Sequence, residues 1–182
     1  KLLAPATLFN EYFGSGLSSI VFQEIREKKA LAYAAYSYFS TPNEKDKSHY
    51  TYAYVGTQAD KLNDATEAML NLMNNMPEAQ MQFNSAKEAA IKKLESDWVT
   101  GAGVYWQYAS AQKLGRDYDI RKQVYEQIKA MTINDLVDFF NHHIKGKNYH
   151  IAVIGNKEHL DTESLNKLGK VNELTLEEIF GY

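Results

Sequence analysis

The sequence predicts an α+β domain in which helices cover one face of an antiparallel-rich mixed sheet. Three observations indicate this class. Residues 32–39 and 50–55 alternate tyrosines with small or polar residues, as strands do. Longer segments around this pair space their apolar residues three and four apart, as helices do. An apolar run at residues 149–154 predicts a last strand. Elements grouped in this way favour the α+β class.

The chain opens with two short predicted helices that meet at a glycine-rich break. Residues 8–13 place four apolar side chains on one helical face, and residues 20–25 do the same. Gly14, Ser15 and Gly16 separate the two segments. Because glycine suits positions that need a positive φ, this tripeptide predicts a tight turn.

A polar turn and a series of helices follow. Residues 41–47 lie between the two strands and predict a hairpin with antiparallel pairing. Thr132 and Asp135 form a capping pattern for the last helix of the series, and Gly146 ends that helix. The expected helices are residues 60–75, a second that ends near residue 98, 103–114, 120–130 and 132–146.

A single domain accounts for residues 1–182. A chain of this length with 45% hydrophobic residues can bury a core without a second domain. We expect that core to span about residues 5–155. Residues 156–182 are then an appendage, with a helix at 163–168 and a turn at 175–178.

The composition excludes several classes of function. A formal charge of -3 lacks the basic excess of nucleic-acid binders, so no nucleic acid is expected as a partner. The absence of cysteine excludes disulfides and leaves histidine and carboxylates as zinc ligands. No apolar run approaches the ~20 residues of a membrane span, and none is expected. No signal peptide opens the chain, but Lys1 is not a natural start, which leaves room for a leader or a larger upstream part.

The residues around the glycine break carry a longer pattern. Its positions fit the motif LGGG-x-SSRLFQ-x-[IL]RE-x-GLAY at Gly14, Gly16, Ser18, Ser19, Phe22, Gln23, Ile25, Arg26, Glu27, Leu31, Ala32 and Tyr33. On this pattern the chain resembles the pitrilysin/insulinase-type zinc metallopeptidases, a family that includes the mitochondrial processing peptidase. Ala30 stands where the family usually has glycine, and Ile20 where it often has arginine.

The resemblance also has a consequence for the sheet. The half-domain of this family has the same order of elements, with one more strand before the first helix. We therefore expect the opening strand to be missing and its position in the sheet to be filled by another segment.

The predicted first helix lacks the zinc ligands of the family. Catalytic halves carry H-x-x-E-H there, in which two histidines bind the metal and the glutamate activates water. Residues 7–13 contain no histidine. The resemblance therefore implies the C-terminal, non-catalytic half of a peptidase, which is inactive alone and has no cofactor of its own. It would complete the active site of a separate zinc-binding N-terminal half or partner subunit, with a peptide substrate between the halves as in a clamshell.

The five histidines of the chain offer one other arrangement for a metal. His142 and His143 are adjacent and point in different directions on a helix. Asp138 and His142 lie four residues apart and could share a metal. An ordinary charge pair on a solvated helical face is the competing interpretation.

The resemblance implies that Arg26 and Tyr33 contact the substrate near the scissile bond. A guanidinium supplies several fixed donors and a phenol one more, and such donors can hold peptide carbonyls or a developing oxyanion. In the local alternative, Arg26 pairs with Glu27 at a helix end and Tyr33 is one of many sheet tyrosines.

Two further features have open interpretations. Gly14, Ser15 and Gly16 coincide with a loop that is linked to substrate entry in some family members, or they form a simple turn. The hairpin tyrosines could expose an edge to which an extended substrate adds as a strand, or they could pair across the strands. These residues are Tyr33, Tyr36, Tyr38, Tyr50, Tyr52 and Tyr54.

Two functions follow for the chain as a whole. The first is the zinc-free half of a two-domain metallopeptidase. The alternative is a non-proteolytic structural or assembly subunit with the same fold. The resemblance favours the bacterial periplasm as the location, because bacterial family members with this layout are often periplasmic. The cytoplasm stays open, since the lack of cysteine is compatible with both compartments.

Overall fold

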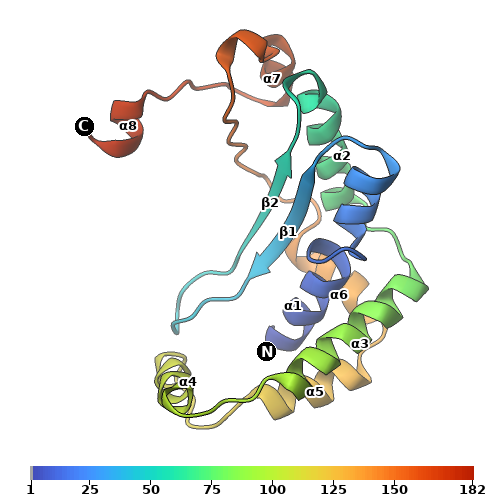
Figure 1. The fold of residues 1–182 in the computed structure, drawn as a ribbon, viewed down its shortest axis with the longest axis vertical. Coiled ribbons are helices and arrows are strands. Elements are labelled where there is room, and N and C mark those ends of the chain that lie inside the picture. The colour runs from blue at the N-terminus through green and yellow to red at the C-terminus, as the bar shows by residue number, and fades with distance from the viewer. Residues whose placement is uncertain (1) are drawn as a thin grey trace.

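A computed structural model describes residues 2–182 of the chain. Its α-helices are α1 (Leu3–Phe9), α2 (Leu62–Asn74), α3 (Gln80–Ser96), α4 (Ala102–Lys113), α5 (Arg121–Ala130), α6 (Ile133–His143), α7 (Thr162–Leu168) and α8 (Leu176–Phe180). Its strands are β1 (Ala34–Ser40) and β2 (Tyr50–Gly56). The elements form an arc, with α4 and α8 near its two ends and the hairpin on the inner side (Figure 1). This arrangement leaves one face of the hairpin uncovered.

The two N-terminal helical segments contain wide π-helical turns. α1 continues into the first π segment (Asn10–Gly14), and the second π segment (Phe22–Lys28) follows the glycine break. The amide and the hydroxyl of Ser15 both donate to the carbonyl of Asn10, at 2.7 and 2.9 Å, which satisfies an oxygen at the helix end. The predicted pair of helices at a glycine break is confirmed. Their π-helical form was not predicted.

The hairpin buries one face against the helices. β1 and β2 pair antiparallel, with Tyr36 opposite Tyr54. The residues of β1 that face the helices are buried, and they are Ala35, Ser37 and Phe39. The alternate positions carry tyrosines that stay exposed. The α+β class, the hairpin and the one-sided helical cover are therefore confirmed.

The prediction of a final strand is wrong. Residues 149–154 form no strand, and their backbone makes no backbone hydrogen bond within residues 2–182. Ile154 has a relative exposure of 101%. An apolar run suits a strand, but a strand also needs a ladder partner, which local sequence does not supply. The sheet described here is thus a two-stranded antiparallel hairpin, smaller than the predicted mixed sheet.

The core joins α1, the hairpin and α6 through aromatic side chains. The rings of Phe9 and Phe13 stack with centroids 5.0 Å apart, and Phe9 lies 5.2 Å from Phe139. Phe39 brings β1 into the same cluster, 4.9 Å from Phe139. Each fully buried side chain of this size stabilises the fold by roughly 1.5–3 kcal/mol. The helices predicted at residues 60–75, up to about residue 98, at 120–130 and at 132–146 are confirmed as α2, α3, α5 and α6, and each contributes residues to this core.

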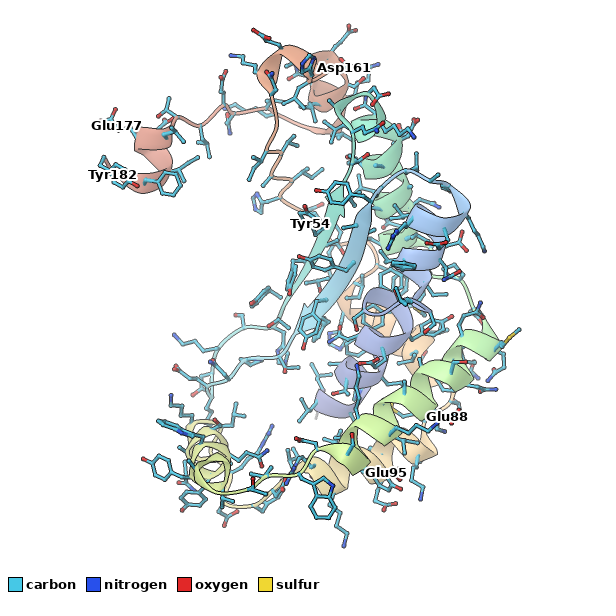
Figure 2. The ribbon with its side chains drawn as sticks, in the orientation of Figure 1. Tyr54, Glu88, Glu95, Asp161, Glu177 and Tyr182 are labelled. Carbon is cyan, nitrogen blue, oxygen red and sulfur yellow. The ribbon has the colours of Figure 1, made fainter. Side chains whose placement is uncertain are left out.

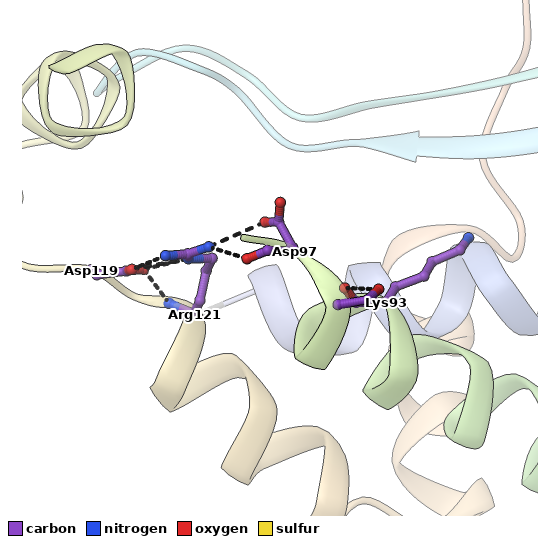
Figure 3. A network of polar contacts seen from close by, with 5 residues as sticks. Lys93, Asp97, Asp119 and Arg121 are labelled. Atoms are coloured by element: carbon purple, nitrogen blue, oxygen red, sulfur yellow. Dashed lines mark hydrogen bonds and ion pairs between the residues drawn. The ribbon is translucent and has the colours of Figure 1, made fainter. Parts of the chain in front are cut away.

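Polar contacts fix the chain where α3 ends and α5 begins. Arg121 donates from Nη2 to Asp119 at 2.6 Å and from Nη1 to Asp97 Oδ2 at 3.3 Å (Figure 3). The hydrogen bonds from Arg121 lower the pKa of the Asp119 carboxyl group. Lys93 of α3 pairs with Glu11 of the first π segment. Exposed ion pairs contribute only ~0–1 kcal/mol, so these contacts orient the elements more than they stabilise them.

The last part of the chain is exposed. No side chain of residues 156–182 is buried. The predicted helix at 163–168 is confirmed as α7, and the predicted turn at 175–178 forms the start of α8. Asp161, just before α7, accepts a hydrogen bond from Asn63 of α2 at 3.3 Å. Within residues 2–182, no helix is both long enough and apolar enough to span a membrane.

Candidate functional site

Tyr33 lies just before β1 and is 69% exposed. Its amide donates to the carbonyl of Gly56 at 3.0 Å, and its ring lies over the same residue. A Cβ at position 56 would come within 2.5 Å of that ring, so the ring position requires glycine. The Tyr33 hydroxyl lies 3.4 Å from the hydroxyl of Tyr54, and this hydrogen bond raises the pKa of Tyr54. Figure 2 shows Tyr54 on the side of the hairpin away from the helices.

A strained cap leads the chain into Tyr33. Ala30 ends the second π segment with φ at +49°, in the left-handed region where glycine is usual. Its amide donates to the carbonyl of Arg26 at 3.1 Å, and the amide of Leu31 donates to Ile25 at 3.0 Å. Thr57 then donates its hydroxyl to the carbonyl of Leu31 at 2.5 Å. These bonds fix the backbone between the two predicted substrate contacts.

Arg26 is exposed on the second π segment and has local contacts only. Its guanidinium carbon lies 4.8 Å from the centroid of the Phe22 ring. Its Nε lies 3.8 Å from a carboxylate oxygen of Glu27, so the predicted local alternative for Arg26 is present. Such an exposed pair holds a side chain weakly. No hydrogen bond from the Arg26 guanidinium is found within residues 2–182, and its donors are accessible.

The contacts of Arg26 and Tyr33 do not overlap. Tyr33 is held by Gly56 and Tyr54, and Arg26 by Phe22 and Glu27. Within residues 2–182 no hydrogen bond or ion pair joins them. Their joint role in binding a substrate is therefore a proposal and not an observation.

The glycine break has a packing role. Gly14 is buried against β1, where an added Cβ would lie 1.8 Å from the carbonyl oxygen of Ser37. Gly16 has φ at +92° in open surroundings, which explains a second glycine. The hydroxyl of Ser15 donates a hydrogen bond to the carbonyl of Asn10. The turn interpretation accounts for all three residues, and a contact of this loop with substrate stays a prediction.

Six tyrosines form a surface on the hairpin that we name the tyrosine face. Its members are Tyr33, Tyr36, Tyr38, Tyr50, Tyr52 and Tyr54, with exposed fractions from 41% to 69%. The rings of Tyr36 and Tyr54 stack at 5.2 Å, and Tyr38 lies 5.9 Å from Tyr52. The cross-strand pairs that the sequence predicts are therefore present. Their outer surfaces stay accessible, so pairing does not exclude binding.

Three of the five histidines lie close together, since His49 and His143 both pack against Phe39 and His142 is next to His143. Within residues 2–182 no three or more histidine, aspartate and glutamate side chains form a group that could hold a metal ion. His142 Nδ1 lies 2.7 Å from the backbone carbonyl of Asp138. That contact turns one ring nitrogen toward its own helix. The pair supplies two ligands at most, and zinc sites in proteins use three or four.

Two cavities lie away from Arg26 and Tyr33. One, of about 510 Å³, is lined by the start of α1 and by α6, including His142. The other, of about 630 Å³, lies between α4 and residues 114–121 and is lined by Trp106 and Tyr118. Neither cavity is lined by a residue of the predicted substrate site.

Comparison with known families identifies the part of the chain that carries this site. Residues 1–90 match the family model described as peptidase M16 inactive domain. The match covers just under half of the chain, and over these residues the chain is similar to that family. The match contains the glycine break, both π segments, the hairpin, α2 and the start of α3. The predicted relationship to the non-catalytic half of zinc metallopeptidases is confirmed.

Solved structures of low sequence identity share the fold of this chain. A peptidase M16 inactive domain from Pseudomonas fluorescens superposes with a TM-score of 0.63 and 19% identity, over 79% of this chain and 34% of that one. A conserved protein from Enterococcus faecalis V583 gives 0.63 and 16%, over 80% and 34%. A protease from Helicobacter pylori gives 0.60 and 20%, over 76% and 33%. The shared part is about one third of each of those chains. No curated protein sequence matches this one.

Two residues that shape the site were not predicted from the sequence. The ring of Tyr33 packs against Gly56, and the buried side-chain amide of Asn10 forms hydrogen bonds with the backbone of Phe39. A glycine at the end of a strand is a signal for close approach of another group. An asparagine on the apolar face of residues 8–13 is a signal for a buried polar partner.

Proposed function

We propose that this chain is the zinc-free half of a two-half M16-type metallopeptidase, which binds peptide and completes the active site of a zinc-binding half. One combined observation carries the proposal. Residues 1–90 match the inactive domain, and the first helix has no histidine where catalytic halves carry H-x-x-E-H. On this proposal the chain is inactive alone. The other half, on the same polypeptide or in a partner subunit, holds the zinc.

The surroundings of Tyr33 support a role in holding the substrate. Its backbone is bonded to Gly56, its ring rests on the same residue, and its hydroxyl meets that of Tyr54. A phenol that is already fixed can donate to a peptide carbonyl, or to the oxyanion that forms from it, with little reorganisation. Arg26 adds accessible guanidinium donors from the neighbouring segment.

Substitution in the complete two-half enzyme tests both residues. We expect Arg26→Ala and Tyr33→Phe each to lower peptide turnover by about a hundredfold, because one transition-state donor is lost. The zinc content of the enzyme should not change. Lys92→Ala and Tyr125→Phe remove similar groups from exposed parts of α3 and α5 and should keep full turnover. Undiminished turnover in Arg26→Ala and Tyr33→Phe would contradict the assignment of these residues to the site.

A third variant moves Tyr33 without changing its chemistry. Gly56→Ala places a methyl group within 2.5 Å of the Tyr33 ring and must displace it. If the position of the phenol matters, turnover falls although the hydroxyl is still in the chain. If only the overall fold matters, Gly56→Ala and Tyr125→Phe should give the same turnover.

The local contacts of Arg26 favour one alternative function. Its guanidinium packs on Phe22 and pairs with Glu27, as an arginine with only a structural role would. The chain would then be a non-proteolytic assembly subunit. A zinc-binding H-x-x-E-H partner half that is active only with this chain would argue against the alternative, and a complex without any such half would favour it.

A further inference from the structure

The cavity beside α4 combines aromatic walls with charged side chains. Its volume is about 630 Å³, within the range of small-ligand sites in proteins. Trp106 and Tyr108 of α4 line it together with Tyr118 of the following loop. α4 has no buried residue, so these rings do not belong to the core of the domain. Their exposed fractions, from 54% to 65%, leave apolar surface that a bound ring would remove from water.

Backbone hydrogen bonds hold the loop that forms one wall of the cavity. The amide of Arg116 donates to the carbonyl of Ala111 at 2.9 Å, and the amide of Gly115 donates to that of Gln112 at 2.9 Å. Gly115 has φ at +68°, so it ends α4 as a left-handed glycine cap. The side chain of Gln112 also donates to the carbonyl of Arg116 at 3.1 Å. The backbone at Arg116 is therefore fixed before any ligand binds.

Two of the four charged residues that line the cavity are already paired with each other. Arg121 donates from Nε and Nη2 to Asp119, and from Nη1 to Asp97 (Figure 3). Asp119 also accepts a hydrogen bond from the amide of Arg121 at 2.9 Å. Each of the three guanidinium nitrogens of Arg121 thus has an acceptor within the protein. The charges of this pair offset each other and are not free for a ligand.

The other two charged residues of the cavity, Arg116 and Asp117, have no such partner. Both line the cavity, and within residues 2–182 neither side chain forms an ion pair or a hydrogen bond. A guanidinium is suited to a carboxylate, and a carboxylate is suited to an ammonium group. Because the two residues are adjacent, the cavity offers one positive and one negative group close together, beside aromatic rings.

We propose that this cavity binds a free aromatic amino acid in its zwitterionic form. Arg116 binds the carboxylate of the ligand, Asp117 binds its ammonium group, and the ligand ring packs against Trp106. Aromatic rings attract one another beyond the area that they bury, which favours an aromatic ligand over an aliphatic one. Neither Arg26 nor Tyr33 lines the cavity, so this site is independent of the proposed peptidase half.

Titration of the present chain with L-phenylalanine tests the proposal. This ligand has no indole, so tryptophan emission of the protein reports its binding. We expect the emission to change and to saturate below about 10 mM ligand. Trp106→Phe should abolish the change, whereas Trp98→Phe, outside the cavity, should preserve it. The absence of a saturable change, or a change that depends on Trp98 and not on Trp106, would overturn the proposal.

Derivatives of the ligand separate its two charged contacts. Phenylalaninamide lacks the carboxylate, and N-acetyl-phenylalanine lacks the ammonium group. We expect each to bind about tenfold more weakly than phenylalanine, because each loses one charge-assisted hydrogen bond. N-acetyl-phenylalaninamide lacks both groups, as a residue within a polypeptide does, and should bind most weakly. If this doubly capped form bound as tightly as phenylalanine, the cavity would accept polypeptide side chains and the proposal would be wrong.

Two variants assign these contacts to residues. Arg116→Gln should weaken binding of phenylalanine about tenfold but should not weaken binding of phenylalaninamide, which has no carboxylate to lose. Asp117→Asn should likewise weaken phenylalanine but not N-acetyl-phenylalanine. Lys122→Gln and Glu126→Gln change exposed charges of α5 outside the cavity and should leave binding as in the parent. A variant of Arg116 or Asp117 that weakens phenylalanine and the matching derivative equally would contradict the assigned charge contact.

Discussion

Ala30 shows how a single backbone angle connects the two proposed site residues. Within residues 2–182, only Ala30 and Asp46 combine a side chain with a positive φ. The left-handed conformation costs an ordinary residue roughly 1–2 kcal/mol, and it persists here because the following backbone is tied to Ile25 and Thr57. The sequence already pointed to an unusual backbone conformation at Ala30, because glycine is usual at this position in the family. The strain itself became visible only with the backbone.

We predict that Ala30→Gly stabilises the domain. Glycine relieves the left-handed strain but adds about 0.5–1 kcal/mol of backbone entropy to the unfolded chain, so a net gain of roughly 0.5–1 kcal/mol is expected. Urea unfolding measures it. Ala89→Gly, inside α3, is the matched control and should destabilise by about 1 kcal/mol. Two variants that destabilise alike would show that the cap at Ala30 is not strained.

His143 is the residue that links stability to pH near neutrality. It packs against Phe139 at 4.9 Å and Phe39 at 5.9 Å, and burial together with the positive charge of neighbours lowers its pKa. The unfolded chain then binds a proton more readily than the folded one as pH falls below the ordinary histidine value of about 6.5. Stability is accordingly higher above that pH and is lost as pH falls from it toward the lowered folded pKa.

We predict that the free energy of unfolding falls between pH 7 and pH 5.5, and that His143→Phe makes it less dependent on pH. Phenylalanine keeps an aromatic ring in the cluster with Phe39 and Phe139 but has no proton to bind. Denaturant titrations at several pH values measure the slope. His159→Phe, in the exposed tail, is the control and should keep the slope of the parent. An unchanged slope in His143→Phe would contradict the assignment.

At the scale of elements, the sequence predicted those helices and strands whose formation depends on residues close to one another in the chain. Apolar spacing identified α2 and α6, and tyrosine alternation with a polar turn identified the hairpin. The prediction of a strand at residues 149–154 was wrong, because strand pairing depends on a partner that the sequence of this segment does not encode. The π-helical form of the two N-terminal segments was not predicted, because the spacing of apolar residues over so short a segment does not separate one helix type from another. The sequence pattern gives the helix there but not its pitch.

Asn10 is the clearest case of one element fixing another. It is 6% exposed and satisfies both the amide and the carbonyl of Phe39. We predict that Asn10→Ala destabilises the domain by about 2–4 kcal/mol, because two buried backbone groups lose their partners. Chemical unfolding measures the change. Asn75→Ala loses only an exposed bond to Asn71 and should change stability by less than about 0.5 kcal/mol. Equal effects in the two variants would show that water replaces Asn10 at the strand edge.

At the scale of the molecule, the surfaces that remain open are aromatic. The tyrosine face lies on the inner side of the arc, and α4 at one end of the arc has no buried residue and exposes Tyr105 and Trp106 (Figure 1). Exposed aromatic groups of this extent are typical of surfaces that meet a partner. The sequence predicted the strands and helices that carry these groups. It could not predict their exposure, because a tyrosine or tryptophan fits a core and an interface equally well.

The exposed tail provides a test of how far the stable core extends. No side chain in residues 156–182 is buried, and Asp161 reaches α2 by a single exposed hydrogen bond. We therefore predict that removal of residues 156–182 lowers Tm by no more than about 4 °C and preserves one cooperative transition in circular dichroism. Removal that begins at residue 133 also deletes α6, with Leu136, Phe139 and Phe140 of the core, and should abolish the transition. If the shorter deletion alone abolished it, the exposed apolar side chains Leu174, Leu176 and Phe180 would have to pack on the domain in solution, and the core would extend to the end of the chain.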